Sequence, residues 1–517
     1  MGSLPDLTER SRPHSVRTAG RTRSDPHRNR AVINQIPVST IYKKEWPWKK
    51  TKTPIRNTNA RRRDSAASSV GAASVRRLIA RQPPQLPGPL VKRYTLLCIA
   101  SGLCYTALIP FTAFAGAEAG ALPLAILHTV AAVVSPFSTI ILQKVGIRLT
   151  VTTAHVVISL LLAAHIIDIP LMILLPLYAI CGLTYSPMTL ALFVSATTVS
   201  QAAGDEPRRK VVLRRALRGL HAAQDIGIVL GSLLLGASLL IWQEDVAPAF
   251  QSSNLQGNSS EDFYVEDDYE EKTCGSEGCP GVQSLPVSTL SAQGRQILVA
   301  VWATLAFFAA CIAVFGTVAG QSPQPDARTI AKDPRTILGI PMGLFIGFQQ
   351  GFILTSYIKW YGVCVGGWGG GWRALFGTGA LQTLAAATLS MAAARGRRGA
   401  LAAGGAAAHA SLLLALLRWR AARTDLALPA VAAAAWGACA ALWEVLQIGV
   451  CVGGGGWRGP WSIIIGSRHA GLALACVARA FLCVRSQLAI LALSLLSALI
   501  SFAVLHWRTR AESRHRT

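Results

Sequence analysis

The sequence predicts an all-α polytopic membrane protein with about 12 transmembrane helices. Hydrophobic residues make up 51% of its 517 residues and charged residues only 15%, which is too apolar for one ordinary soluble core. The apolar residues form runs long enough to cross a bilayer. The net charge of +25 comes from basic residues gathered in an amino-terminal tail and in short loops between those runs. This pattern is typical of membrane topology, so we expect the lipid bilayer as a partner and no nucleic acid.

Residues 1–91 come before the first apolar run and are rich in Arg, Ser and Pro, without apolar periodicity. Such a composition predicts a disordered basic cytoplasmic tail. The first apolar run begins too late for a secretory signal peptide. We therefore expect the first spanning helix to direct insertion into the membrane.

The rest of the chain is a succession of apolar runs of about 17 to 25 residues, each long enough to span a bilayer as a helix. The alanine-rich third quarter is only mildly hydrophobic, so hydropathy marks its helices least clearly. We expect spanning helices near 94–115, 121–143, 149–167, 171–198, 219–242, 296–319, 337–358, 374–394, 400–418, 427–452, 463–484 and 487–507.

A polar cytoplasmic connection at 321–336 divides these runs into two sets of six. The amino-terminal half covers 92–320 and the carboxy-terminal half 337–507, and a basic cytoplasmic tail follows at 508–517. Lys and Arg in short loops are retained on the cytoplasmic side, which predicts that both termini face the cytoplasm. The arginines of 418–425 fall on the outer side and depart from this rule. The sequence thus predicts an integral protein of the plasma membrane or an endomembrane.

The longest loop of this topology, 243–294, lies on the outer or lumenal side and is acidic at 259–272. Asn258 begins the sequon "NSS", so we expect a glycoprotein modified at this residue. Cys274 and Cys279, in "CGSEGC", are disulfide candidates, because an oxidising compartment allows them to pair with each other. A metal site is not expected, since no His or second Cys pair flanks them.

Two adjacent amides, Gln349 and Gln350, interrupt the seventh predicted helix. A side-chain amide in hydrocarbon needs a hydrogen-bond partner, so these residues should face a neighbouring helix or an internal cavity. Gly347 and Gly351 lie four residues apart on the same helix and would let that neighbour approach closely. The sequence therefore predicts an internal, rather than lipid-facing, surface here.

Polar residues also occur within other predicted spans. Together with the two glutamines they form a candidate intramembrane polar cluster of Gln224, Asp225, Gln349, Gln350, Gln382, Glu444 and Gln447. An ionised carboxylate at mid-bilayer costs about 2.5 to 3.5 kcal/mol, so Glu444 requires protonation, a cationic partner from another helix or a water-filled cavity. Asp225 lies seven residues after Arg218 and close to the predicted cytoplasmic end. Helices seven and ten share one half, so we expect Gln349 or Gln350 to reach Glu444 or Gln447.

The two sets of six helices resemble the halves of a major facilitator fold. The loop "QKVGIR" (143–148) is similar to a basic loop motif of that superfamily, retaining Lys144, Gly146 and Arg148 without its acidic residue. More specifically, "GIPMGLFIGFQQGFILTSYIKWYGVCVGG" (339–367) resembles the signature seventh helix of the Unc (uncoordinated-ninety-three) family of ion channel regulatory proteins.

Further stretches resemble that family in the same order. Residues 174–201 resemble its fourth helix, 221–235 its fifth helix, 274–280 its paired-cysteine loop and 430–447 its tenth helix. The overall resemblance covers roughly 94–505. The chain departs from the family at Ile228, where Asn is common, and at Ala440 and Glu444, where Asp and Gln are expected.

The resemblance implies an accessory protein that regulates or escorts a partner membrane protein, such as a potassium channel subunit or a Toll-like receptor. The alternative is a major facilitator secondary transporter, in which Glu444 and the glutamines line a central pathway and couple a proton or ion to a small solute. The sequence has no phosphate-binding loop, "HExxH" motif or nucleophile elbow. We therefore expect neither an enzymatic activity nor a cofactor.

Overall fold

The structure is a computed structural model, and it describes residues 86–514 apart from 119, 168, 246–273, 282–287, 319–332, 395–396, 423–424, 426 and 454–460. Three predicted features lie wholly or mostly outside the described residues. They are the amino-terminal tail, the sequon at Asn258 and the connection at 321–336.

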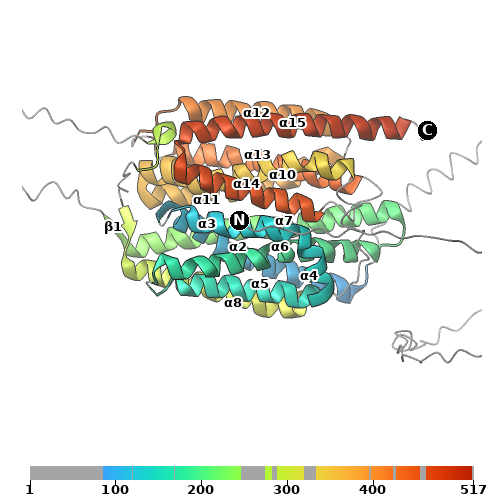
Figure 1. Cartoon of the computed structure of the whole chain (residues 1–517), viewed down its shortest axis with the longest axis horizontal. Helices are drawn as coiled ribbons and strands as arrows, with labels where there is room; N and C mark the ends of the chain where they lie inside the picture. Colours follow the sequence, from blue (N-terminus) through green and yellow to red (C-terminus); the bar gives the residue numbers. More distant parts are fainter. Residues whose placement is uncertain are drawn as a thin grey trace, which may run out of the picture. The chain divides into compact units, whose positions relative to one another are not determined.

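Long helices follow one another along the described chain (Figure 1). The helices of the first half are α2 (Gly88–Glu118), α3 (Leu122–Val134), η2 (Ser135–Phe137), α4 (Ser138–Val145), α5 (Ile147–Ala164), α6 (Leu171–Gln201), α7 (Glu206–Trp242) and α8 (Ala292–Gly316). Those of the second are α10 (Pro334–Phe352), the π-helix η4 (Ile353–Val363), α11 (Cys364–Ala394), α12 (Arg398–Arg418), α13 (Leu428–Gly453), α14 (Trp461–Phe481) and α15 (Val484–Arg514).

Eleven helical stretches of the described chain are long and apolar enough to cross a membrane. One of them, Pro334–Ala393, has 60 residues and would be about 90 Å long if straight, three times the roughly 30 Å hydrocarbon core. Its backbone leaves the helical region at Gly366 and Gly367. An added Cβ at Gly362 would lie 3.2 Å from the Cα of Gly371. In a straight helix two residues nine positions apart are separated by about 13.5 Å, so these two residues belong to neighbouring segments. The chain turns back here, so this stretch supplies two passes.

Each predicted span overlaps one of these stretches, the seventh and eighth both falling in Pro334–Ala393, and several ends differ, of which two are informative. The fifth span was predicted from residue 219, but α7 begins at Glu206, because the charged segment ahead of it is also helical. Pro207 occupies its first turn, and Glu206 pairs with Lys210 one turn later at 2.9 Å. The last helix, α15, continues to Arg514, so most of the predicted basic tail from 508 is helical.

The two halves repeat the same neighbour relations (Figure 1). The first helix of each half packs against the fifth and sixth, as α2 does with α7 and α8, and α10 with α14 and α15. The second packs against the fourth, in the pairs α3–α6 and α11–α13, and the third against the fourth and sixth. Between the halves the pairing is reciprocal, since the second helix of each meets the fifth of the other, in α3–α14 and α11–α7.

Backbone contact at glycine holds the first and fifth helix of each half together. In the first half, a Cβ at Gly227 of α7 would overlap the carbonyl oxygen of Gly102 of α2. In the second half, a Cβ at Gly347 of α10 would overlap the carbonyl oxygen of Arg468 of α14, and one at Gly351 would lie 2.6 Å from the Cβ of Ala475. The predicted close approach at Gly347 and Gly351 is confirmed, and the neighbouring helix is α14.

The loop between α7 and α8 is attached to the second half by two disulfides. Strands β1 (Gln243–Asp245) and β2 (Ser288–Leu290) pair antiparallel at its two ends, and the short helix η3 (Gly275–Glu277) lies within it. Cys274 is bonded to Cys364, where η4 meets α11, and Cys279 to Cys483, between α14 and α15.

The predicted bridge between Cys274 and Cys279 is therefore wrong. The segment that carries them lies against the second half, where the backbone N–H of Val484 donates to the carbonyl of Gly278 at 2.8 Å. The two cysteines accordingly face different helix ends. The sequence contained a signal for these partners, since the predicted topology puts 364 and 483 near helix ends on the same side of the membrane as the loop.

Candidate functional site

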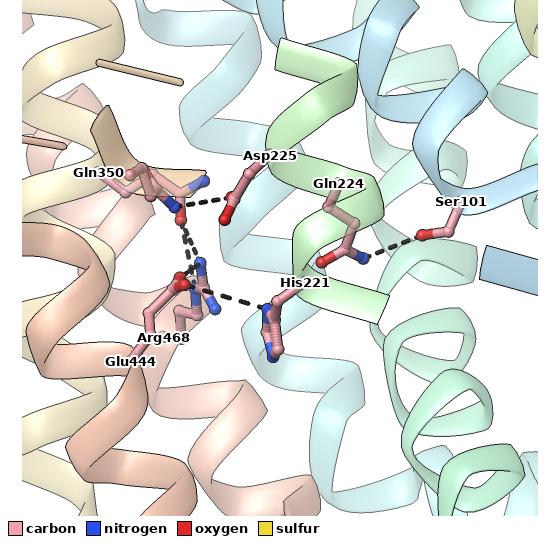
Figure 2. A network of polar contacts seen from close by, with 8 residues as sticks. Ser101, His221, Gln224, Asp225, Gln350, Glu444 and Arg468 are labelled. Atoms are coloured by element: carbon pink, nitrogen blue, oxygen red, sulfur yellow. Dashed lines mark hydrogen bonds and ion pairs between the residues drawn. The ribbon is translucent and has the colours of Figure 1, made fainter. Parts of the chain in front are cut away.

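Buried and partly buried polar side chains from α7 of the first half and from α10, α11, α13 and α14 of the second gather in one place (Figure 2). The cluster has a cationic centre, Arg468 of α14. Its Nη2 donates to Oε1 of Glu444 at 2.7 Å and to Oε1 of Gln350 at 2.8 Å, and its Nε donates to the same Gln350 oxygen at 3.2 Å. The side chain of Glu444 is 12% exposed and that of Arg468 26%. A carboxylate inside the bilayer requires protonation, a cationic partner or a water-filled cavity, and Glu444 has a cationic partner.

Sequence reasoning missed Arg468. It lies within the predicted span 463–484, in "GSRHAG", and a charged residue inside a span is itself a signal of an internal functional position. The expected contact of Gln350 with Glu444 is mediated by this arginine instead of being direct.

Helix α7 contributes to the cluster through one of its faces. His221 and Asp225 are one turn apart and both point toward the second half (Figure 2). Oδ1 of Asp225 accepts a hydrogen bond from Nε2 of Gln382 of α11 at 2.9 Å, and Nδ1 of His221 lies 4.0 Å from Oε2 of Glu444. Asp225 is 3% exposed, which places it in the interior although the sequence put it near a helix end. These contacts join the two halves.

The remaining predicted cluster residues make no side-chain hydrogen bond to this centre among the described residues. Gln224 points to the opposite side of α7 and donates to the hydroxyl of Ser101 on α2 at 2.9 Å (Figure 2). Gln349 is 1% exposed, and its Oε1 has no hydrogen-bond partner among the described residues. Gln447 is 7% exposed, and its Nε2 likewise has no partner in the part of the chain that the structure describes. The cluster therefore comprises Gln350, Gln382, Asp225 and Glu444, with Arg468 and His221 added.

A cavity lies beside this cluster and between the two halves, with about 900 Å³ of empty space, solvent at its opening included. Helices α2, α3 and α6 line it from one half, and α10, η4, α13 and α14 from the other. Its apolar lining is mainly aliphatic, with leucine and isoleucine side chains from both halves. Its polar lining comprises Tyr105, Thr112, His128, Tyr185, Thr189, Gln350, Thr355, Gln447, Arg468 and His469.

Two features give this cavity its chemistry. No carboxylate lines it among the described residues, so Arg468 is its one charged side chain within that part of the chain, with Glu444 behind it. His128 and His469, from opposite halves, stack with ring centroids 5.5 Å apart and their Nδ1 atoms at 3.4 Å. The cavity therefore offers N–H donors and a positive charge to a bound molecule, and an apolar wall to its body.

Contacts between the halves flank the cavity in both directions along the helices. Toward the disulfides, Nε1 of Trp368 donates to Glu118 at 3.1 Å and Arg479 donates to the carbonyl of Gly116. At the opposite end, the rings of Phe193 and Trp461 stack with centroids 4.2 Å apart.

No family model matches the chain, and no curated protein matches it either.

Proposed function

We propose that the chain is a two-halved membrane protein of the major facilitator type that binds a small anionic solute in its central cavity and moves it across the membrane. The reciprocal pairing of α3 with α14 and of α7 with α11 supports this arrangement, because two repeated halves related by a two-fold axis along the membrane normal produce such pairs. The positive-inside rule supports cytoplasmic termini.

The observation that carries the proposal is Arg468 in the wall of the cavity. Its Nη1 makes no hydrogen bond to any described residue, and the buried Nε2 of Gln447 lines the same space without a partner there. An arginine and an amide donor together match the oxygens of a carboxylate. The aliphatic wall suits a monocarboxylate with an apolar body.

The pairing of Arg468 with Glu444 provides a route for coupling. A solute carboxylate competes with Glu444 for the same guanidinium, and a carboxylate that loses its cationic partner inside the membrane takes up a proton more readily. His221, 4.0 Å from the other oxygen of Glu444, is placed to exchange that proton. Solute binding and protonation of Glu444 then favour each other.

The test uses the purified full chain with benzoate as the probe and benzamide, its neutral analogue, as the control ligand. We expect benzoate, and not benzamide, to raise the unfolding temperature, and Arg468→Gln to abolish the effect. Arg485→Gln, at an exposed position outside the cavity, should retain it. A protein that responds to neither benzoate nor acetate would contradict the anionic-solute hypothesis. Uptake of labelled benzoate into proteoliposomes under a proton gradient then tests transport.

A second candidate function is the accessory role that the Unc-family resemblance implies, in which the protein regulates or escorts a channel subunit or a receptor. One observation favours it. The bonds Cys274–Cys364 and Cys279–Cys483 tie a loop of the first half to the second half, which restricts the separation that alternating access requires on that side. Copurification of a channel or receptor subunit from native membranes, without benzoate binding, would support this function over transport.

A further inference from the structure

Three arginines converge on a second pocket at the end of the bundle opposite the disulfides. Arg214 and Arg218 come from α7, about two and three turns after its start, and Arg398 is the first residue of α12. The pocket also includes Ser390 near the end of α11 and Gly449 near the end of α13, so it lies between the two halves. It encloses about 420 Å³ of empty space, solvent at its opening included.

The guanidinium groups are only partly used within the protein. Arg218 donates to the hydroxyl of Ser390 at 2.9 Å and, through Nε, to the carbonyl of Arg214 at 3.1 Å. Arg398 donates to the carbonyl of Gly449 at 3.1 Å. The Nε of Arg214 is buried and has no hydrogen-bond partner in the described part of the chain. Each arginine therefore keeps donors that can be directed to a ligand.

The charges in this pocket are not balanced within the described residues. No Asp or Glu lines it, and all three arginines are half-buried, where like charges repel more strongly than in water. The other lining residues, Ala393, Val445 and Ile448, supply no countercharge. An anion with several oxygens would relieve the repulsion and accept the unused donors, as phosphate does in arginine clusters.

The level of the pocket indicates where such an anion comes from. The pocket lies where α11 ends, α12 begins and α13 ends, which is the level of the lipid headgroups for helices that span a membrane. Basic pockets between helices at this level fit anionic headgroups, and the apolar side chains beside the arginines fit the start of an acyl chain. Free phosphate has the same oxygens without an acyl chain.

We infer that Arg214, Arg218 and Arg398 form a binding site for a phosphate monoester, carried by an anionic lipid. The site is separate from the central cavity, and it lies where α7 of one half meets α11, α12 and α13 of the other. Its occupant bridges the halves and stabilises their contact at this end.

The experiment is native mass spectrometry of the purified full chain with added phosphatidic acid, phosphatidylcholine or inorganic phosphate. Phosphatidic acid should bind in preference to phosphatidylcholine. Arg214→Gln combined with Arg398→Gln should weaken its binding by about tenfold or more, since two charge-assisted contacts are lost. Arg215→Gln is the matched control, because Arg215 is an exposed neighbour on α7 that does not line the pocket.

The outcomes separate the two sources of phosphate. Inorganic phosphate that competes with phosphatidic acid equally well would assign the site to a soluble phosphate compound, and the lipid assignment would fail. Equal binding of phosphatidic acid and phosphatidylcholine, or equal loss in Arg215→Gln, would overturn the site itself. Arg398→Lys, which keeps the charge, checks that weaker binding does not result from misfolding, because it should bind at an intermediate level with an unchanged unfolding temperature in the absence of lipid.

Discussion

Arg468 and Glu444 form the ion pair at the centre of the polar cluster. Removing one partner of a buried ion pair leaves an uncompensated charge, whereas replacing both by apolar residues is often neutral. Glu444 is the better shielded of the two, since only 12% of its side chain is exposed. The cost of breaking the pair should therefore depend on which charge remains.

We expect Glu444→Leu to lower the free energy of unfolding by about 3 to 5 kcal/mol, because Arg468 then lacks its carboxylate. The double variant Glu444→Leu with Arg468→Met should be more stable than the Glu444→Leu single variant. Unfolding temperatures in detergent and surface expression measure both effects. Additive losses in the double variant would show that the two side chains do not act as a pair.

Glu444→Gln separates a structural role of this residue from a coupling role. The amide oxygen still accepts from Nη2 of Arg468, so the variant should reach the membrane and keep more stability than Glu444→Leu. Without an ionisable group it cannot take up a proton, so proton-driven uptake should be lost. Uptake that keeps its dependence on the proton gradient in this variant would exclude Glu444 as the coupling residue.

At the scale of elements, α10 and α14 form a pair whose contact was partly predictable. The spacing of Gly347 and Gly351 predicted a close neighbour, but the sequence does not identify that neighbour as α14, since hydropathy says only which segments enter the membrane. Hydropathy therefore predicted the spanning segments, but it could not predict that Arg468 is the partner of Glu444. Such partners depend on which helices become adjacent after insertion.

Gly347→Ala should destabilise the protein, because a Cβ at this position overlaps the carbonyl oxygen of Arg468, a backbone atom that cannot move without its helix. Displacing that turn of α14 should also weaken binding of benzoate at Arg468. Gly404→Ala on α12 is the matched control, since a Cβ there meets no atom within 4 Å. Equal unfolding temperatures for both variants would show that α10 and α14 do not pack as closely as described.

The disulfides of the structure replace the predicted bridge between Cys274 and Cys279, and they lead to a new prediction. Digestion without reduction should give peptides that link Cys274 to Cys364 and Cys279 to Cys483. In Cys364→Ala, Cys274 should become available to a maleimide reagent on the outer side. A peptide with Cys274 bonded to Cys279 would show that the loop closes on itself, as its sequence first suggested.

The described part of the chain is almost entirely helical, with eleven stretches long and apolar enough to cross a membrane, and its composition and hydropathy predicted this helical membrane architecture. The site between the two halves was only partly predictable. Gln350, Glu444, Asp225 and Gln382 do gather there, since polar groups in a membrane must find partners away from lipid. Gln224 does not, because a change of one position along α7 turns the side chain by about 100° and hence toward α2.

Orientation in the membrane gives a prediction for the molecule as a whole. Asn258 lies outside the described residues, and its glycosylation stays a prediction. A glycosidase should shift the electrophoretic band of the protein expressed in animal cells, and Asn258→Gln should remove that shift. An unmodified chain whose loop 243–294 is cut by protease added to the cytoplasmic side would contradict the proposed orientation.

The connectivity of the disulfides also orders events during biogenesis. Cys279 and its partner Cys483 are 204 residues apart. At a synthesis rate of about 5 to 20 residues per second, Cys483 is therefore synthesised roughly 10 to 40 s after Cys279. Cys364 follows Cys274 in less than half that time, since these two cysteines are 90 residues apart. Chains that stop before Cys483 keep Cys279 without its disulfide partner. Closure of the second bond therefore reports that the chain has been synthesised through α14, and thiol-dependent retention would act on every chain that has not reached that stage.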